Sequence, residues 1–253
     1  MYNAIPLASI LFLDIECVSG EATLEEMPEA VAALWRQKAP RIMRVDELND
    51  EESARAFVDR AAVYAEFGKI VCISVGMFAG DGEELAFRVK SYADAEERVL
   101  LDEFAALVAQ LSARIQASGS RAELRFCGHN IKEFDMPYIG RRMLLHGMTL
   151  PASLDLRGKK PWETKHLLDT MEMWSFGDRK NYTSLKLLAA LFGIPSPKDD
   201  IDGSQVGRVF WEDNDLERIA TYCEKDVVAT TNVFLAMTGR ALLNEERVVY
   251  VGR

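Results

Sequence analysis

The sequence has few cysteines and no excess of positive charge. Its four cysteines are far apart, form no C-x-x-C pair and lie inside apolar runs, which favours reduced core thiols over a zinc site or disulfides. The net charge is −10, from 30 Lys and Arg against 40 Asp and Glu, and this excludes a polybasic nucleic-acid coat protein, whose binding depends on cations that neutralise phosphates. An enzyme that acts on nucleic acid is not excluded, since a local basic groove can lie on an acidic body.

A membrane-spanning hydrophobic run is also missing from the opening stretch, AIPLASILFLDIE. This stretch is too short to span a bilayer, has no basic leader and ends in two acids, so we expect a cytoplasmic protein that does not bind a membrane. The chain has 253 residues, of which 49% are hydrophobic and 28% charged, as is typical of a soluble globular protein. We expect a single domain over residues 1–253.

Strand and helix patterns are mixed along the chain. Apolar runs rich in branched residues predict strands at residues 10–15, 70–78, 85–89, 124–127 and 167–169. Helical spacing of apolar residues predicts helices at residues 93–116, 137–145, 184–192 and 216–243. This order favours an α/β sandwich with a mixed sheet that contains one hairpin. Residues 21–66 are charged and helical in pattern, and we interpret them as a helical insertion after the first strand.

Two carboxylates end the first predicted strand. Asp14 and Glu16 flank Ile15, and side chains at i and i+2 of a strand point to the same face. A buried strand that ends in paired acids is costly unless a cation neutralises them. The pattern D-x-E is a weak signal by itself, because a strand that runs out into a solvated turn also explains it.

Two later motifs also carry polar groups that can reach one centre. In GHNIKEFDMPYI, Asn130 and Asp135 lie in a loop that enters a helix, where Asp135 could simply cap the helix. In ATYCEKDVVATTNVF, Tyr222 and Asp226 are four residues apart and share one helical face. A tyrosine at the edge of the core and a solvated aspartate are the plain alternative for this second motif.

Together, DIE, N-IKE-FD and Y-CEK-D resemble, in that order, the three exonuclease motifs of the DEDD superfamily of 3′→5′ exonucleases. The chain is most similar to stand-alone proteins related to the proofreading exonuclease domain of family-B DNA polymerases, and residues 66–76, 185–206 and 219–230 also look like that group. The resemblance implies a ribonuclease H-like fold with a mixed five-stranded sheet flanked by helices.

The resemblance also implies the roles of the motif residues. It implies that Asp14 bridges two divalent cations, Mg²⁺ or Mn²⁺, that Glu16 and Asp226 complete the tighter site, and that Asp135 holds the second cation through water. The chain matches the branch with a tyrosine four residues before the last aspartate, and none of its three histidines is placed to act as the base. Tyr222 would orient the attacking water, since a phenol with a pKa near 10 is a poor base at neutral pH.

Candidate substrate contacts come from charge and aromaticity. Between residues 141 and 186 the chain has nine Lys or Arg against five acids, which predicts a phosphate track or, equally, a solvated loop. Phe134 could stack on a terminal base or pack under its loop. The candidate substrate-binding residues are Asn130, Phe134, Lys159, Lys160, Arg179 and Lys180.

We therefore expect a metal-dependent 3′→5′ exonuclease that hydrolyses single-stranded DNA from its 3′ end. Two alternatives stay open: an exoribonuclease with the same motifs, because discrimination rests on contacts near the 2′-hydroxyl, and a catalytically silent nucleic-acid-binding module of the same fold. A silent relative usually lacks a ligand, whereas all four acids and the tyrosine are present in this chain.

Overall fold

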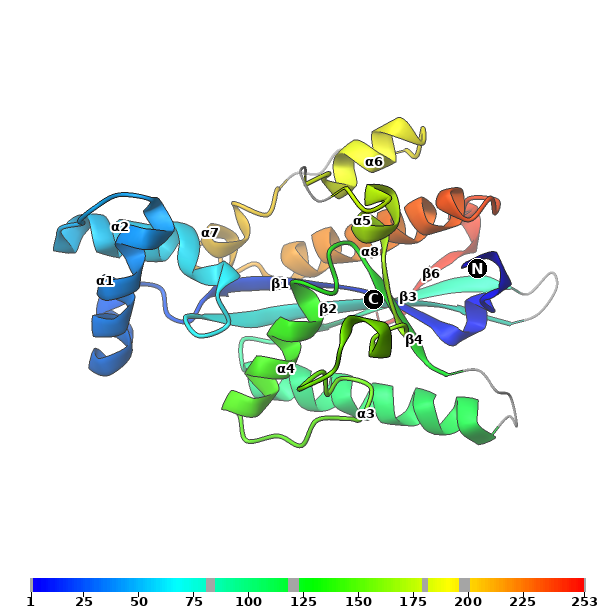
Figure 1. The fold of residues 1–253 in the computed structure, drawn as a ribbon, viewed down its shortest axis with the longest axis horizontal. Coiled ribbons are helices and arrows are strands. Elements are labelled where there is room, and N and C mark those ends of the chain that lie inside the picture. Colours follow the sequence, from blue (N-terminus) through cyan, green and yellow to red (C-terminus); the bar gives the residue numbers. More distant parts are fainter. Residues whose placement is uncertain (1, 81–84, 118–122, 179–181, 196–200, 253) are drawn as a thin grey trace.

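A mixed sheet of six strands forms the centre of the molecule (Figure 1). The computed structural model describes residues 2–80, 85–117, 123–178, 182–195 and 201–252. The strand order is β5-β4-β1-β2-β3-β6; β1, β2 and β3 are antiparallel neighbours, and the pairs β1/β4, β4/β5 and β3/β6 are parallel. The strands are β1 (Ile10–Ser19), β2 (Gly68–Ala79), β3 (Ala86–Ala93), β4 (Arg125–Gly128), β5 (Leu167–Asp169) and β6 (Val248–Tyr250).

Helices cover both faces of the sheet. In Figure 1, α8, α5 and α6 lie on one side of it, and α3 and α4 lie on the other. The α-helices are α1 (Glu29–Met43), α2 (Asp50–Arg60), α3 (Glu97–Ala117), α4 (Asp135–Leu145), α5 (Thr170–Ser175), α6 (Leu185–Leu191), α7 (Val206–Trp211) and α8 (Leu216–Met237). Among the described residues, no helix is both long and apolar enough to cross a membrane. The predicted α/β class with a mixed sheet between helices is confirmed.

The alternation of β1 determines which residues face which helices. Leu11 and Leu13 pack into the core cluster that contains Phe104 of α3. Phe12 faces the other side, where its ring makes an edge contact with Phe234 of α8 at 5.6 Å between centroids. Because all of these side chains are buried and each contributes about 1.5–3 kcal/mol on burial, β1 is fixed in register between the two helical layers.

The structure adds to the predicted elements at three points. β6 joins the far edge of the sheet as a sixth strand, and α5 and α7 are short helices of six residues each that the apolar spacing did not indicate. The last long helix ends at Met237 rather than at residue 243. All four cysteines are free thiols, as expected, and three of them are buried.

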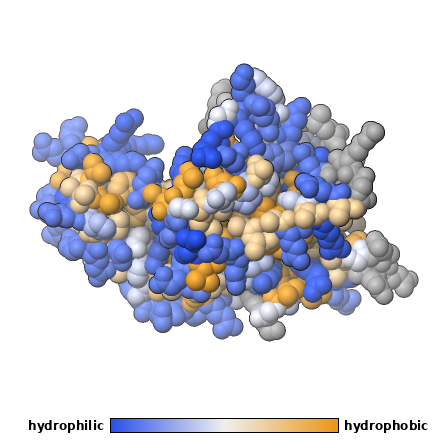
Figure 2. All heavy atoms as spheres, turned by 90° about the horizontal axis from the view of Figure 1, so that it is seen from below, coloured by the Kyte–Doolittle hydropathy of each residue, from blue (hydrophilic) through white to orange (hydrophobic). Residues whose placement is uncertain are grey.

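The segment between β1 and β2 forms a small helical lobe. It contains α1, α2 and two 3₁₀ turns (Leu24–Glu26 and Ala61–Val63), and it projects from one end of the molecule (Figures 1 and 2). Its own core surrounds Trp35, whose ring contacts Phe57 and Phe67 edge-on and whose indole N–H donates to the carbonyl of Ser53 at 2.9 Å. The helical insertion predicted at residues 21–66 is therefore present as two helices with a separate core.

Candidate active site

Asp14 and Glu16 lie on the face of β1 that packs against α8. They continue the alternation of Phe12, and Asp14 pairs with Ser74 on β2. The β1–β2 register shifts between Glu16 and Cys17. Such a bulge re-aims side chains and is common beside active sites. Glu16 is buried and Asp14 is half-buried, so both carboxylates face the sheet–helix boundary rather than a solvated turn.

Asp135 enters the same region from the opposite side of β1. It is the first residue of α4 and is buried, with 3% of its surface exposed. The residue in the capping position is Phe134, and no side-chain cap is formed there. The capping role considered for Asp135 is therefore wrong, and its burial needs another explanation.

The loop that carries Asp135 is held by Asp169 at the end of β5. The Asp169 carboxylate accepts hydrogen bonds from the backbone N–H groups of Asn130 and Lys132 at 3.1 Å each, and from those of Met171 and Glu172 at 2.9 and 3.2 Å. It thus caps α5 and fixes the β4–α4 loop with one side chain. Asn130 has a left-handed backbone (φ 66°), which asparagine tolerates better than most residues.

Tyr222 and Asp226 come from α8. Asp215 caps this helix by accepting a hydrogen bond from the N–H of Arg218 at 3.0 Å. Tyr222 and Asp226 lie one turn apart on the face of the helix toward β1. The hydroxyl of Tyr222 is hydrogen-bonded to Asp226. β1, α4 and α8 therefore contribute the five motif residues to one place.

The four carboxylates repel one another. Burial raises the pKa of Asp14 well above its usual range, and the charges of Glu16, Asp135 and Asp226 raise it further. Burial and the charge of the neighbouring Asp226 raise the pKa of Glu16 well above its usual range. Burial also raises the pKa of Asp135 to about 7, against opposing backbone hydrogen bonds.

This arrangement suits hard divalent cations, since it concentrates carboxylate oxygens whose mutual repulsion a cation relieves. Ligand atoms of Asp14, Glu16 and Cys223 lie within 4.8 Å of one another. A cation at this point would be held by Asp14 and Glu16 of β1, with Asp226 of α8 nearby.

A cleft of about 900 Å³ opens onto these carboxylates. Its wall includes four of the five predicted catalytic residues, Asp14, Asp135, Tyr222 and Asp226, but not Glu16. It also includes two predicted substrate contacts, Asn130 and Phe134. Other parts of the wall were not among the candidate residues, namely His129, Tyr182, Lys186 and Gln205. Tyr182 is 69% exposed, and its pKa is raised by burial of part of the ring and by the nearby charges of Asp135 and Asp14.

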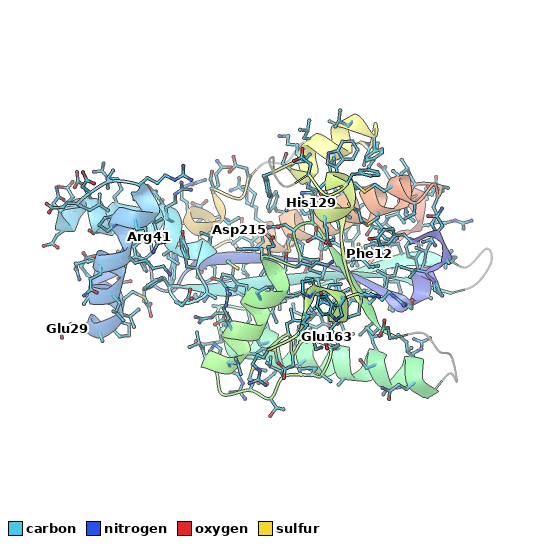
Figure 3. All side chains as sticks on the ribbon, viewed as in Figure 1. Phe12, Glu29, Arg41, His129, Glu163 and Asp215 are labelled. Atoms are coloured by element: carbon cyan, nitrogen blue, oxygen red, sulfur yellow. The ribbon has the colours of Figure 1, made fainter. Side chains whose placement is uncertain are left out.

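His129 is a structural residue of this cleft. Its Nε2 lies 2.9 Å from the carbonyl oxygen of Thr183 and its Nδ1 lies 3.0 Å from Oγ1 of Thr170, and its ring meets that of Tyr182 edge-on at 6.3 Å. Burial lowers its pKa, so it is neutral at neutral pH. In Figure 3 it lies on the side of the sheet covered by α5 and α6. It therefore joins the β4–α4 loop to the segment before α6.

Of the predicted phosphate track, Lys186 lines the cleft, whereas Lys159 and Lys160 do not. Lys159 lines a different hollow, of about 590 Å³, together with His166 and residues of α3. The ammonium group of Lys160 lies 5.1 Å from the ring centroid of Trp162. Arg179 and Lys180 lie outside the described residues. Roles of Lys159, Lys160, Arg179 and Lys180 in substrate binding stay predictions.

Comparison with known proteins identifies a family for most of the chain. Residues 63–248 match a family described as a predicted 3′-5′ exonuclease related to the exonuclease domain of PolB. No curated protein matches the chain. Among solved structures, the family B DNA polymerase from the hyperthermophilic archaeon Pyrobaculum calidifontis is similar, with 14% identity and a TM-score of 0.46 over 90% of this chain. The chain spans only 27% of the length of that polymerase.

Proposed function

Because the chain belongs to the family of predicted 3′-5′ exonucleases related to the exonuclease domain of PolB, we propose that it hydrolyses single-stranded DNA from the 3′ end in a metal-dependent reaction. The observation that carries this proposal is the convergence of four carboxylates and a tyrosine from β1, α4 and α8, of which all but Glu16 line one cleft. Asp14 and Glu16 lie before the matched residues, and the closeness of their charges to those of Asp135 and Asp226 supports their inclusion in the proposed site. We take the whole chain as one exonuclease domain.

The chemistry follows from the residues present. Two divalent cations, when bound, supply the Lewis acidity that activates a water and stabilises the leaving oxyanion. Asp14, Glu16, Asp226 and Asp135 would supply the carboxylate ligands of these cations. Tyr222 positions the water, since burial and the charge of Asp226 raise its pKa far above neutral and leave the phenol protonated.

The cleft also contains groups suited to a strand end. Phe134 and Tyr182 offer aromatic faces on which a base can stack irrespective of its identity. Lys186 of α6 can contact a phosphate, and Oδ1 of Asn130 is a buried acceptor without a partner among the described residues. A paired end would first have to be unpaired and unstacked, at a cost of a few kcal/mol, so single-stranded or frayed ends are the favoured substrates.

The test is digestion of 5′-labelled single-stranded DNA and RNA of the same sequence, with Mg²⁺, Mn²⁺ or EDTA. We expect a ladder that shortens from the 3′ end, faster on DNA, and no reaction in EDTA. Faster digestion of RNA would make the protein an exoribonuclease. Binding without hydrolysis in either metal would indicate a silent module. Cuts in a circular single strand would contradict an exonuclease altogether.

A further inference from the structure

Each of the two helices in the lobe between β1 and β2 has a basic residue in its last turn. α1 has Glu29 in its first turn and Arg41 in its last, and Figure 3 shows these two residues at opposite ends of the helix. α2 has three acids in its first turn and Arg60 in its last. Residues 36–44 include four basic and no acidic side chains, on a chain whose net charge is −10. This local contrast marks a surface for a polyanion.

The two basic helix ends meet at one hollow on the lobe. The hollow has a volume of about 490 Å³ and is lined by Ile42, Met43, Arg44, Arg60, Val63 and Tyr64. Arg44 ends α1 with a left-handed backbone (φ 57°). The ammonium group of Lys38 lies 4.8 Å from the ring centroid of Tyr64. We call Lys38, Arg41, Arg44, Arg60 and Tyr64 the basic surface of the lobe.

The guanidinium groups of this surface have no ion-pair partner among the described residues. Within the described part of the chain, Arg41, Arg44 and Arg60 form no ion pair, and all three are exposed. The other two arginines of the lobe differ, since Arg36 pairs with Asp50 and Arg55 with Glu51, each at 3.3 Å. The negative ends of the two helix dipoles favour cations at this end of the lobe.

The lobe is anchored to the helix that begins at the candidate active site. Tyr138 of α4 donates its hydroxyl to the carbonyl of Ala62 at 2.9 Å, and Arg142 donates to the carbonyl of Ala65 at 2.8 Å. Arg142 is itself held by the buried carboxylate of Glu97. Because α4 begins with Asp135, these contacts fix the lobe relative to the cleft.

We propose that the basic surface of the lobe binds the phosphate backbone of a single-stranded nucleic acid at nucleotides outside the catalytic cleft. The proposal rests on the proposed function for the identity of the polyanion. Guanidinium groups match phosphate in a bidentate geometry, and Tyr64 with its apolar neighbours can accept a base. The insertion thereby lengthens the contact with the strand beyond the terminal nucleotide.

The experiment measures binding without hydrolysis. Anisotropy of labelled single-stranded DNA of about 4 and about 30 nucleotides is recorded in EDTA at several salt concentrations. In the combined variant Arg41→Gln, Arg44→Gln, Arg60→Gln, the affinity for the long DNA divided by the affinity for the short DNA should fall about tenfold. Its slope of log affinity against log salt should fall by about 2 units, since each single-strand contact contributes about 0.7. Arg55→Gln, on the same lobe but ion-paired in the protein, is the matched control and should keep the wild-type ratio and slope.

Each result decides between the two proposals. An unchanged ratio and slope in the combined variant, with hydrolysis by the wild type intact, overturns the lobe surface and leaves the exonuclease proposal standing. If the combined variant loses the ratio but the wild type hydrolyses neither DNA nor RNA, the lobe surface stands and the exonuclease proposal is overturned. An equal loss in Arg55→Gln shows a general charge effect and overturns the surface. The surface is also overturned if the combined variant changes its oligomeric state in sedimentation but not its DNA binding, because the lobe then binds another copy of the protein.

Discussion

The thiol of Cys223 lies against the first motif aspartate: its Sγ is 3.4 Å from the carbonyl oxygen of Asp14 and 3.5 Å from Oδ2. Cys223 follows Tyr222 on α8 and is fully buried. As a donor, the thiol lowers the pKa of Asp14, against the larger effects of burial and of the neighbouring carboxylates. It therefore stabilises the charged form of Asp14 that would bind a cation.

Loss of this donor should weaken cation binding. We expect Cys223→Ala to reduce Mn²⁺ affinity about 2- to 10-fold, the range of one hydrogen bond worth about 0.5–1.5 kcal/mol. Calorimetric titration, or the rise of the melting temperature with Mn²⁺, measures it. Cys127→Ala is the matched control, because Cys127 is a buried thiol on β4 outside the carboxylate cluster and its loss costs similar packing. Equal Mn²⁺ affinity in both variants would show that the thiol only fills space.

The metal-free protein should lose stability as the pH rises from about 4 toward 7. Asp135 has its pKa raised to about 7, and the pKa values of Asp14 and Glu16 are also raised, so the folded state retains protons that the unfolded state has released above about pH 4. The contribution of these groups to the free energy of unfolding is therefore fully present below about pH 4 and is lost as the pH rises. Urea unfolding in EDTA at pH 5 and pH 8 measures the difference, which Asp135→Asn should reduce. Asp59→Asn, an exposed acid of α2, should retain the wild-type difference, and a wild type more stable at pH 8 would contradict the repulsion.

The motif residues were predictable because their chemistry constrains short segments. A buried strand that carries D-x-E, and a tyrosine four residues before an aspartate on a helix, are local patterns. The prediction that the first strand ends at these acids is wrong, because β1 continues to Ser19 along its pairing with β2. The structure places Asp14, Asp135, Tyr222 and Asp226 at one cleft, with Glu16 buried beside Asp14. The role of Asp135 in capping was wrong because a helix start alone does not reveal that Phe134 takes the cap position.

Other parts of the site depend on tertiary contacts that no local pattern reports. The excess of positive charge between residues 141 and 186 does not say on which side of the sheet a lysine lies. Lys159 packs beside α3, with its ammonium group 3.3 Å from the carbonyl of Ala152, whereas Lys186 reaches the cleft from α6. β6 has three residues, too few for a periodic signal, and it exists because β3 offers an edge.

Asp169 should affect both stability and turnover. Asp169→Ala leaves four backbone N–H groups without their acceptor, and we expect a loss of about 2–4 kcal/mol in the free energy of unfolding. Asp169→Asn keeps Oδ1, which serves three of these groups, and loses the bond to Lys132, so its cost should be smaller. Turnover in Asp169→Asn should still fall, because the β4–α4 loop is loosened. Asn49→Ala removes the cap of α2 and serves as control, destabilising without a comparable fall. Parallel urea unfolding and kcat measurements separate the two effects.

The variant Tyr222→Phe tests whether the Tyr222 hydroxyl positions the attacking water or removes its proton. Burial and the charges of Asp226, Glu16 and Asp14 raise its pKa, so the phenol stays protonated through the working range and cannot be the base. Tyr222→Phe keeps the ring, which packs on the core cluster of α7 and α8, and removes only the hydroxyl. We expect turnover to fall about 10²- to 10⁴-fold with Mn²⁺ affinity retained.

The pH dependence of the residual activity completes this test. If the hydroxyl only orients the water, the profiles of the wild type and Tyr222→Phe should run parallel from pH 6 to pH 10, offset by a constant factor. A basic limb in the wild type that disappears in the variant would mean that the phenol ionises during the reaction. Full activity in Tyr222→Phe would remove the hydroxyl from the mechanism and leave the four carboxylates to orient the water unaided.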